Sequence, residues 1–491
     1  MASGDAVAAS APGGGRAPIS SRAPIPRRAW TAAIAASAST FLFVVDSGLL
    51  SIAFPKLAET FSHTPRSTLA WASTGFSVVM AALMAFAGNL ADRVGRRRVY
   101  LGGLTVYGIG AALTASAPTV GLLIAARLLQ GAGAAFFVTS ALALMLVEFP
   151  AERRGAALAV WGVVGSAGAI LAPTVGAEIL DRWSWRWAFA TLAVLALASL
   201  ALGVRGLDDS RSDTAAAAPD AVAVVAGALG IALLTLAFGR GPLWGWTDGR
   251  TLAMLVTGAA LLPVVIRRSR RHPRPLVPPL LMRERSYRLL TLACVVQQIG
   301  FFSYFFSFPI ILTGVWRWSV LRAGYAMAVS MAVSAVVVVL AARFADAHGY
   351  TALIVVGTVV AAASAAWWLA TFGVTPDVAW ALVPGLVLQG AGSSIVGNLT
   401  TAAALRGVPA GLMGSANSLH QMARRVGGAV GVAVTVALLG ESRDRGALLQ
   451  GARRAWVLLI VVHVVMGGLV VLAGAKRSTD APAAAPVPSH P

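Results

Sequence analysis

One segment decides the fold class of this chain, and it reads Gly88-Asn89-Leu90-Ala91-Asp92-Arg93-Val94-Gly95-Arg96-Arg97-Arg98. The segment lies between two long apolar runs and places one carboxylate and four arginines in a short turn that contains glycine. A short, basic loop between two apolar runs is typical of a cytoplasmic connection between two transmembrane helices, because Lys and Arg accumulate on the cytoplasmic side of a membrane protein. The segment and its flanks therefore predict an integral membrane protein.

The composition agrees with this prediction. The 491 residues are 57% hydrophobic and 12% charged, and a soluble domain could not cover its surface with so few polar side chains. The formal charge of +20 does not indicate a nucleic-acid partner, because the arginines fall in clusters between apolar runs and not along one face. Cys294 is the single cysteine, so we expect no disulfide framework and no metal site built on thiolates.

Fourteen stretches are long enough to cross a bilayer, which takes about 20 apolar residues each. They are predicted near 31–54, 68–88, 99–118, 120–146, 156–178, 186–204, 220–239, 251–267, 288–314, 322–342, 351–373, 379–404, 412–438 and 455–474. The stretch 251–267 is short, and an interfacial helix is the alternative for it. Lys and Arg are more numerous in the segments expected inside, so both termini are expected in the cytoplasm of a multi-pass cytoplasmic-membrane protein. The segment 441–454 is an exception to this charge rule, because it is expected outside and yet carries four arginines.

An internal repeat divides the chain into two similar halves. The run Leu128-Leu129-Gln130-Gly131-Ala132-Gly133 recurs as Val387-Leu388-Gln389-Gly390-Ala391-Gly392, and the basic segment recurs in degraded form as Ala342-Arg343-Phe344-Ala345-Asp346-Ala347-His348-Gly349. Repeats of this kind indicate two related helix bundles. We expect six-helix bundles over 29–206 and 287–475, a linker with two further spans over 207–286, and disordered cytoplasmic tails over 1–28 and 476–491.

The basic segment resembles the loop between spans 2 and 3 that marks the major facilitator superfamily of transporters, Gly-x-Leu-Ala-Asp-Arg-x-Gly-Arg-Arg. The six-plus-two-plus-six arrangement resembles that of its 14-spanning drug:proton antiporters. The resemblance implies an all-α integral membrane protein with the major facilitator fold: two six-helix bundles plus two linker transmembrane helices. It also implies a cytoplasmic gating loop made by Gly88, Asp92, Arg93, Gly95, Arg96 and Arg97. The alternative is that these arginines only set the topology.

Asp46 and Arg127 are the candidates for proton coupling. Asp46 lies inside the first span, and an acid at that depth costs about 2.5–3.5 kcal/mol on insertion scales, so such residues mark functional sites by default. Arg127 lies in the fourth span and stays charged at any relevant pH, so it needs an acid, a carbonyl or water as partner. The resemblance implies that this pair takes part in proton coupling. A purely structural ion pair between helices is the alternative.

The fifth span carries a stretch of small residues. It runs from Gly165 to Ala177, and its Gly168, Pro173 and Gly176 resemble the antiporter signature Gly-x-x-x-Gly-Pro-x-x-Gly-Gly. Small residues allow close helix approach and proline bends a span. Ala172 and Ala177 replace two glycines of the pattern, which weakens the case for antiport relative to uniport.

Polar and aromatic residues within the spans are candidates for a substrate cavity. They are Trp71, Phe76, Gln130, Trp161, Gln297, Gln298, Tyr304, Gln389, Asn417 and His420. Aromatic rings can stack on flat or cationic substrates. For each polar residue taken singly, hydrogen bonding between helices is an equal or better explanation. No acid is expected inside the last six spans, and Arg424 and Arg425 receive no role.

The function expected from these features is proton-coupled efflux of small amphipathic compounds, such as drugs or antibiotics, by alternating access. The alternatives are a facilitator or exporter of an endogenous metabolite with other coupling, and a transporter-like sensor that moves nothing. We expect no enzyme, no cofactor and no metal, because the sequence shows no nucleophile elbow, metal cluster or nucleotide-binding loop. The expected partners are the substrate, protons and the lipid bilayer, and the expected state is a monomer.

Overall fold

The computed structural model contains helices and no strands over the residues it describes, which are 27–149, 154–208, 220–272, 279–406, 408, 413–442 and 444–474. The side chains of some helical residues within these ranges also lie outside the described residues, among them Asp92, Arg93, Asp346 and His348. Nearly all of the expected tails, 1–28 and 476–491, fall outside them as well.

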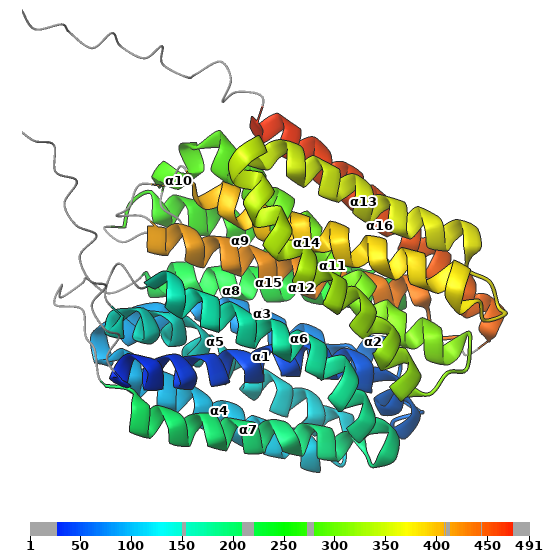
Figure 1. Cartoon of the computed structure of the whole chain (residues 1–491), viewed down its shortest axis with the longest axis horizontal. Coiled ribbons are helices and arrows are strands. Elements are labelled where there is room, and N and C mark those ends of the chain that lie inside the picture. The colour runs from blue at the N-terminus through cyan, green and yellow to red at the C-terminus, as the bar shows by residue number, and fades with distance from the viewer. Residues whose placement is uncertain are drawn as a thin grey trace, which may run out of the picture.

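Long helices follow one another along the whole described chain (Figure 1). The first six are α1 (Arg27–Thr60), α3 (Trp71–Val94), α4 (Arg96–Ser116), α5 (Val120–Glu148), α6 (Arg154–Arg182) and α7 (Trp185–Gly206). Next come α8 (Ala221–Trp244) and α9 (Gly249–Ser269). The last six are α11 (Arg285–Gly314), α12 (Val320–His348), α13 (Tyr350–Thr371), α14 (Val383–Leu405), α15 (Met413–Leu439) and α16 (Arg445–Gly474). Short helices α2 (Arg66–Leu69) and α10 (Pro279–Arg283) precede α3 and α11, and a π-helical turn over Val378–Leu382 leads into α14.

Thirteen of these helices, within the described residues, are long and apolar enough to cross a membrane. The remaining long helix, α8, contains the apolar stretch Val222–Leu234. The helices lie at the 14 predicted spans. The stretch predicted at 251–267, for which an interfacial helix was the alternative, is the 21-residue helix α9 with a mean hydropathy of 1.7.

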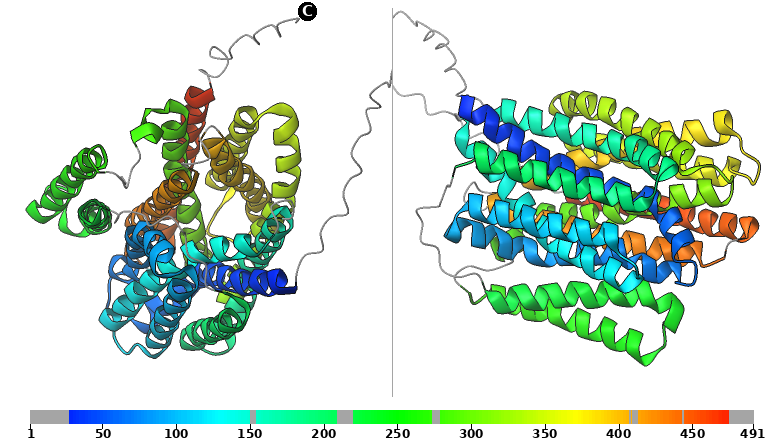
Figure 2. Two further views of the ribbon diagram at one scale, coloured as in Figure 1. Left: turned by 90° about the vertical axis from the view of Figure 1, so that its left-hand side faces the viewer. Right: turned by 90° about the horizontal axis from the view of Figure 1, so that it is seen from below.

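Two bundles and a separate hairpin make up the molecule (Figure 2). Helices α1 and α3–α7 pack with one another, and so do α11–α16. The two bundles meet where α6 packs on α12, α3 on α15 and α1 on α11. Helices α8 and α9 form an antiparallel pair at the side, where α8 contacts both α3 and α15. Arg27 and Gly474 lie at one end of the molecule, which we call the terminal end; the opposite end is the distal end (Figure 1).

Short polar side chains fix where several helices begin. Asp220 accepts the backbone N–H of Ala223 at 3.1 Å and starts α8, and Asp248 accepts that of Arg250 at 2.8 Å and starts α9. Such caps satisfy N–H groups that have no partner within the helix. Asp220 also binds Arg268 of α9 at 2.8 Å, so the two helices of the hairpin are joined at the terminal end. The Arg268 guanidinium holds the pKa of the Asp220 carboxyl below its usual range.

The repeat in the sequence is a repeat in conformation. Gly95, between α3 and α4, has φ 116°, and Gly349, at the matching place between α12 and α13, has φ 87°. Gln130 Oε1 accepts the Thr114 hydroxyl at 2.9 Å. In the second bundle, Gln389 Oε1 likewise accepts a hydroxyl from the preceding helix, that of Ser364, at 2.7 Å.

Two expectations about helix limits were wrong. The last span was predicted to start near residue 455, but α16 begins at Arg445, so Arg453 and Arg454 are exposed helical residues and not part of a loop. The reason is Asp444, whose carboxylate accepts the Ala447 N–H at 2.8 Å and caps the helix ten residues earlier. Helices α1 and α11 each begin two residues before the expected bundle limits.

Candidate functional site

The buried centre of the first bundle holds one ion pair. Arg127 Nη1 of α5 lies 2.6 Å from Asp46 Oδ1 of α1, with relative exposures of 2% and 0% for the two side chains. Arg127 Nε donates to the Ala72 carbonyl at 3.0 Å, and Nη1 also donates to Gln130 Oε1 at 3.1 Å. The Phe76 ring lies under the guanidinium, 4.5 Å from ring centroid to Arg127 Cζ. The sequence predicted both charged residues, and the structure brings them into direct contact.

Several polar atoms around this pair lack a partner. Among the described residues, the buried atoms without a hydrogen bond include Asp46 Oδ2, Gln130 Nε2, Thr74 Oγ1 and Tyr107 Oη. The Tyr107 hydroxyl lies close to Asp46, Arg127 and Gln130 and belongs to the same cluster. Sequence analysis missed Tyr107 and Thr74. The signal was weak, since each is one of several hydroxyl-bearing residues in its helix.

The small-residue stretch of α6 lies between two neighbours. A Cβ at Gly168 would be 3.3 Å from the Phe41 carbonyl oxygen, and one at Gly176 would be 2.9 Å from Leu49, so both glycines allow α6 to approach α1 closely. Pro173 is buried on the opposite neighbour, because its carbonyl lies against Gly324 of α12. Of the predicted trio, Gly168 and Gly176 therefore pack within the first bundle, and Pro173 lies where the first bundle meets the second.

The basic segment is only partly described. Gly95 adopts a φ that side-chain-bearing residues rarely take, which suits the tight turn from α3 into α4. Arg97 donates to the Val204 carbonyl of α7 at 2.7 Å, and Gly88 has open space around its α-carbon. The side chains of Asp92 and Arg93 lie outside the described residues.

Four buried residues among the ten cavity candidates hydrogen-bond to side chains of neighbouring helices. Tyr304 bonds to Ser330 at 2.8 Å, and its ring stacks on Trp368 with centroids 5.7 Å apart. His420 contacts Thr291 at 3.3 Å and Thr401 at 3.2 Å through its two ring nitrogens, so neither faces a ligand. Gln130 and Gln389 make the repeated hydroxyl contacts described above.

The other six candidates make fewer hydrogen bonds between helices. Trp161 is partly exposed and donates to Thr40 at 2.6 Å, and Trp71 and Asn417 are also partly exposed. Gln297 and Gln298 are buried in α11, and Gln297 Oε1 has no partner among the described residues. Phe76 belongs to the surroundings of the ion pair.

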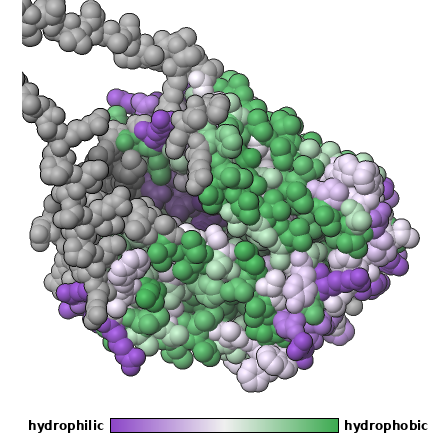
Figure 3. Space-filling view, viewed as in Figure 1, coloured by the Kyte–Doolittle hydropathy of each residue, from purple (hydrophilic) through white to green (hydrophobic). Residues whose placement is uncertain are grey.

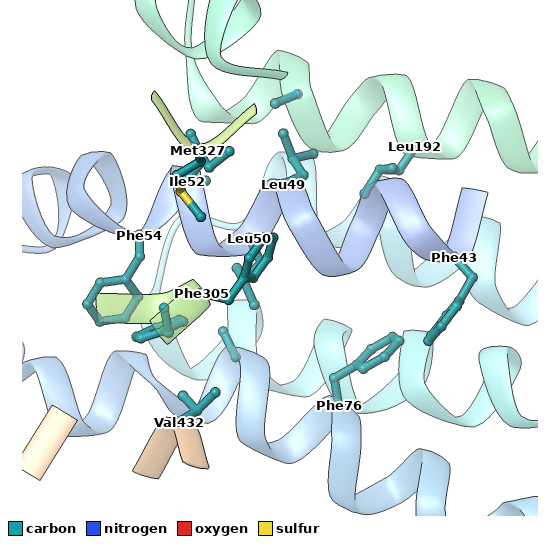
Figure 4. Packing of buried hydrophobic residues seen from close by; sticks show 14 of the residues in the cluster. Phe43, Leu49, Leu50, Ile52, Phe54, Phe76, Leu192, Phe305, Met327 and Val432 are labelled. Carbon is teal, nitrogen blue, oxygen red and sulfur yellow. The ribbon is translucent and has the colours of Figure 1, made fainter. Parts of the chain in front are cut away.

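Contacts between the bundles gather toward the distal end. There the Ser51 hydroxyl donates to the Phe305 carbonyl, and the Phe54 and Phe306 rings lie 4.5 Å apart (Figure 4 shows Phe54 beside Phe305). Glu441, between α15 and α16, accepts the backbone N–H groups of Arg66 at 2.6 Å and Ser67 at 3.1 Å. A hollow lined by hydrophilic residues opens between the bundles toward the terminal end (Figure 3).

No group of three or more His, Cys, Asp or Glu side chains that could hold a metal ion occurs within the described ranges. The charged groups at the centre of the site are one carboxylate, Asp46, and one guanidinium, Arg127, in direct contact. The fold and this buried pair define a multi-pass α-helical membrane protein built from two related bundles.

The chain belongs to the Major Facilitator Superfamily, because the model of that family matches residues 36–432. Among curated proteins, it is 31% identical over 415 residues to the multidrug efflux pump LfrA of Mycolicibacterium smegmatis, covering 83% of this chain and 80% of that one. It is 30% identical over 415 residues to the puromycin resistance protein pur8 of Streptomyces alboniger (84% and 82%). It is 28% identical over 427 residues to the tetracenomycin C resistance and export protein of Streptomyces glaucescens (84% and 76%).

Solved structures show the same fold at low identity. The POT family transporter PepTSo superposes with a TM-score of 0.66 at 14% identity, covering 92% of this chain and 98% of that one. The D-xylose-proton symporter gives 0.65 at 15% identity, with 89% and 97% covered.

Proposed function

We propose that this protein exports small amphipathic compounds of the drug or antibiotic type across the cytoplasmic membrane in exchange for protons. The relatives named above are resistance, export and efflux proteins, which supports the substrate class and the direction. Alternating access would move a cavity between the bundles from one side of the membrane to the other. The contacts at the distal end and the hollow toward the terminal end correspond to the state open at the terminal end, on the cytoplasmic side.

The observation that carries the proton coupling is the Asp46–Arg127 pair. Among the ion pairs of the described residues, it alone has both side chains buried. A proton on Asp46 would cancel the attraction, and Arg127 would keep the Ala72 carbonyl and Gln130 Oε1 as partners. Protonation would therefore change which groups hold α1 to α5 without leaving Arg127 unpaired. The unpartnered Asp46 Oδ2 is where the proton would be held.

Other parts of the proposal concern how the bundles move. Gly168, Pro173 and Gly176 would let α6 slide between α1 and α12, and the basic segment around Gly95 would latch the terminal end. The bundles over 29–206 and 287–475 would act as the moving bodies, with 207–286 as the linker. The protein would work as a monomer with both termini in the cytoplasm.

The test is transport by the purified protein in proteoliposomes under an imposed pH gradient, with a pH dye trapped inside. Lipophilic cations, neutral antibiotics and aromatic acids are added in turn. In the wild type, we expect the transported compound to dissipate the gradient, and Asp46→Asn to slow this proton flux about 100-fold or more, because the proton site is removed. Asp248→Asn, a matched change at an acid outside the spans, should leave the flux unchanged. If Asp46→Asn exchanges protons as fast as the wild type, the coupling proposal is wrong.

A further inference from the structure

Two arginines lie midway along α15, and neither makes an ion pair with a described side chain. Arg424 and Arg425 belong to a helix of 27 residues that runs from Met413 to Leu439. Arg424 Nη1 contacts only a neutral group, Gln421 Oε1, at 3.5 Å. Arg425 makes no ion pair within the described part of the chain, and both side chains are partly exposed.

The acids of the second bundle lie at or beyond the ends of its helices, away from the middle of α15 where Arg424 and Arg425 lie. From 285 to 474 the sequence holds four acids, and they are Asp346, Asp377, Glu441 and Asp444. Asp346 lies in the last turn of α12, and the others lie between helices. A charge held at the middle of a span without an opposite charge is costly, so it requires water or an anion in contact with it.

Arg425 contacts the first bundle through an aromatic ring. Its Cζ lies 4.5 Å from the centroid of Phe43 of α1, and Phe43 stacks on Phe76 with centroids 6.4 Å apart and planes at 20° (Figure 4). Phe76 in turn lies under Arg127. Two arginines thus flank one pair of rings, but Arg127 is paired with Asp46, whereas Arg425 has no acid partner among the described side chains.

An arginine held by its face keeps its edge for a ligand. The planar guanidinium presents five N–H donors in a fork that matches a carboxylate, and stacking on Phe43 fixes the plane without using these donors. One turn along α15, a Cβ at Gly428 would lie 2.9 Å from the Phe302 ring, so this helix face also borders aromatic surface. Phe302 belongs to α11, and in that helix the rings of Phe301 and Phe305 stack with centroids 5.7 Å apart and planes at 10°.

We propose that Arg425, assisted by Arg424, binds the anionic group of the transported compound, so that the preferred substrates are flat aromatic monoanions. This inference rests on the proposed export function and names the substrate class for it. The acidic group takes the free edge of Arg425, and the apolar body lies against the phenyl rings beside it. The proton site and the anion site then lie in different bundles, separated by the Phe43–Phe76 stack.

The test is equilibrium binding to the purified full-length chain in phosphatidylcholine nanodiscs at neutral pH, with empty nanodiscs as the correction for lipid partition. The probes share one ring system and differ in charge: anthracene-9-carboxylate, 9-anthracenemethanol and 9-(aminomethyl)anthracene. We expect the carboxylate to bind about tenfold more tightly than the alcohol and the ammonium most weakly, since a hydrogen bond to a charged group discriminates by this much. Arg425→Gln should remove that preference and leave alcohol binding unchanged, and Arg425→Lys should keep part of it.

The wild-type order of the three probes tests the inference even if a variant does not fold. Arg453→Gln, which removes an exposed arginine of α16, should leave the order unchanged. Equal binding of carboxylate and alcohol, tighter binding of the ammonium, an unaltered preference in Arg425→Gln, or no binding by any probe would each overturn the inference. Binding needs no gradient, so anion selectivity without proton flux would refute only the proposed coupling. Proton-coupled export of cations alone would refute only this inference.

Discussion

Asp46 and Arg127 differ in how completely their polar atoms are satisfied. Arg127 has three hydrogen-bond partners and a ring beneath it, whereas one oxygen of Asp46 has none. Removing one member of a buried pair commonly costs about 3–5 kcal/mol, because the other charge stays buried. Loss of Arg127 would leave a buried carboxylate without its partner, whereas a neutral Asp46 would leave Arg127 two other hydrogen-bond partners, as the proposed proton exchange requires.

Two tyrosines of α4 offer a matched test of the unpartnered cluster. Tyr100 donates to the Ala35 carbonyl at 2.8 Å, while the equally buried Tyr107 hydroxyl lies beside Asp46 and Gln130 without a hydrogen bond of good geometry among the described residues. Tyr100→Phe should lower the free energy of unfolding by about 1 kcal/mol or more, because it leaves a buried carbonyl unsatisfied. Tyr107→Phe should be neutral or stabilising. Thermal unfolding in detergent measures both, and an equal loss in the two variants would mean that Tyr107 has a partner in the folded protein.

Glycines set the spacing between neighbouring helices. A Cβ at Gly131 of α5 would lie 2.5 Å from the Phe76 backbone oxygen, and one at Gly390 would meet the Ser330 backbone in the same way in the second bundle. The pair of contacts explains why the sequence run around these glycines occurs twice. It also ties the position of Phe76, and hence of the ring below Arg127, to the packing of α3 on α5.

Gly131→Ala should destabilise the protein by about 1–3 kcal/mol, because backbone atoms cannot move aside as a flexible side chain can. Gly102→Ala, in α4 with nothing within 4 Å of the added Cβ, should instead stabilise by about 0.5–1 kcal/mol through helix propensity. Unfolding midpoints of the two variants in the same detergent give the comparison. Similar changes of the same sign would show that α3 and α5 are not in close contact at Gly131.

The sequence is sufficient for those features that depend on one helix or on the repeat. Apolar length predicts the spans, and the depth of Asp46 and Arg127 within them predicts that both need a partner. The start of α16 was missed because an apolar window ignores the cap at Asp444. The stacking of Arg425 on Phe43 and the contact of Glu441 with Arg66 were beyond reach, since each joins segments from different bundles whose relative placement no local pattern encodes.

One carboxylate contributes strongly to the contact between the two bundles at the distal end. Glu441 accepts two backbone N–H groups at the start of α2, and Arg66 returns a bond to the Ser442 carbonyl at 3.3 Å. Glu441→Ala should favour the state open at that end by about fivefold, because losing such a cap costs about 1 kcal/mol. Asp444→Ala, which removes a cap within the second bundle alone, is the matched control and should not change this balance.

The measurement is the rate at which a membrane-impermeant maleimide added at the distal side labels Ser51→Cys, with Cys294→Ser as the background. Ser51 is buried where α1 meets α11, so labelling requires that the bundles separate there. Glu441→Ala should raise the labelling rate about fivefold over the background. Equal rates would show that Glu441 does not hold the bundles together.

The two bundles share a fold and a pattern of glycines and glutamines, yet their charges diverge. By the spacing of the repeat, Leu386 of α14 stands where Arg127 stands in α5, and the second bundle carries no acid within its long helices except near the end of α12. If the proposed proton site and anion site are correct, mutations in the second bundle would change which compounds are recognised without altering the proton site in the first. Resistance to a new compound would then require few substitutions, because the proton site and the substrate site would lie in different bundles and could change independently.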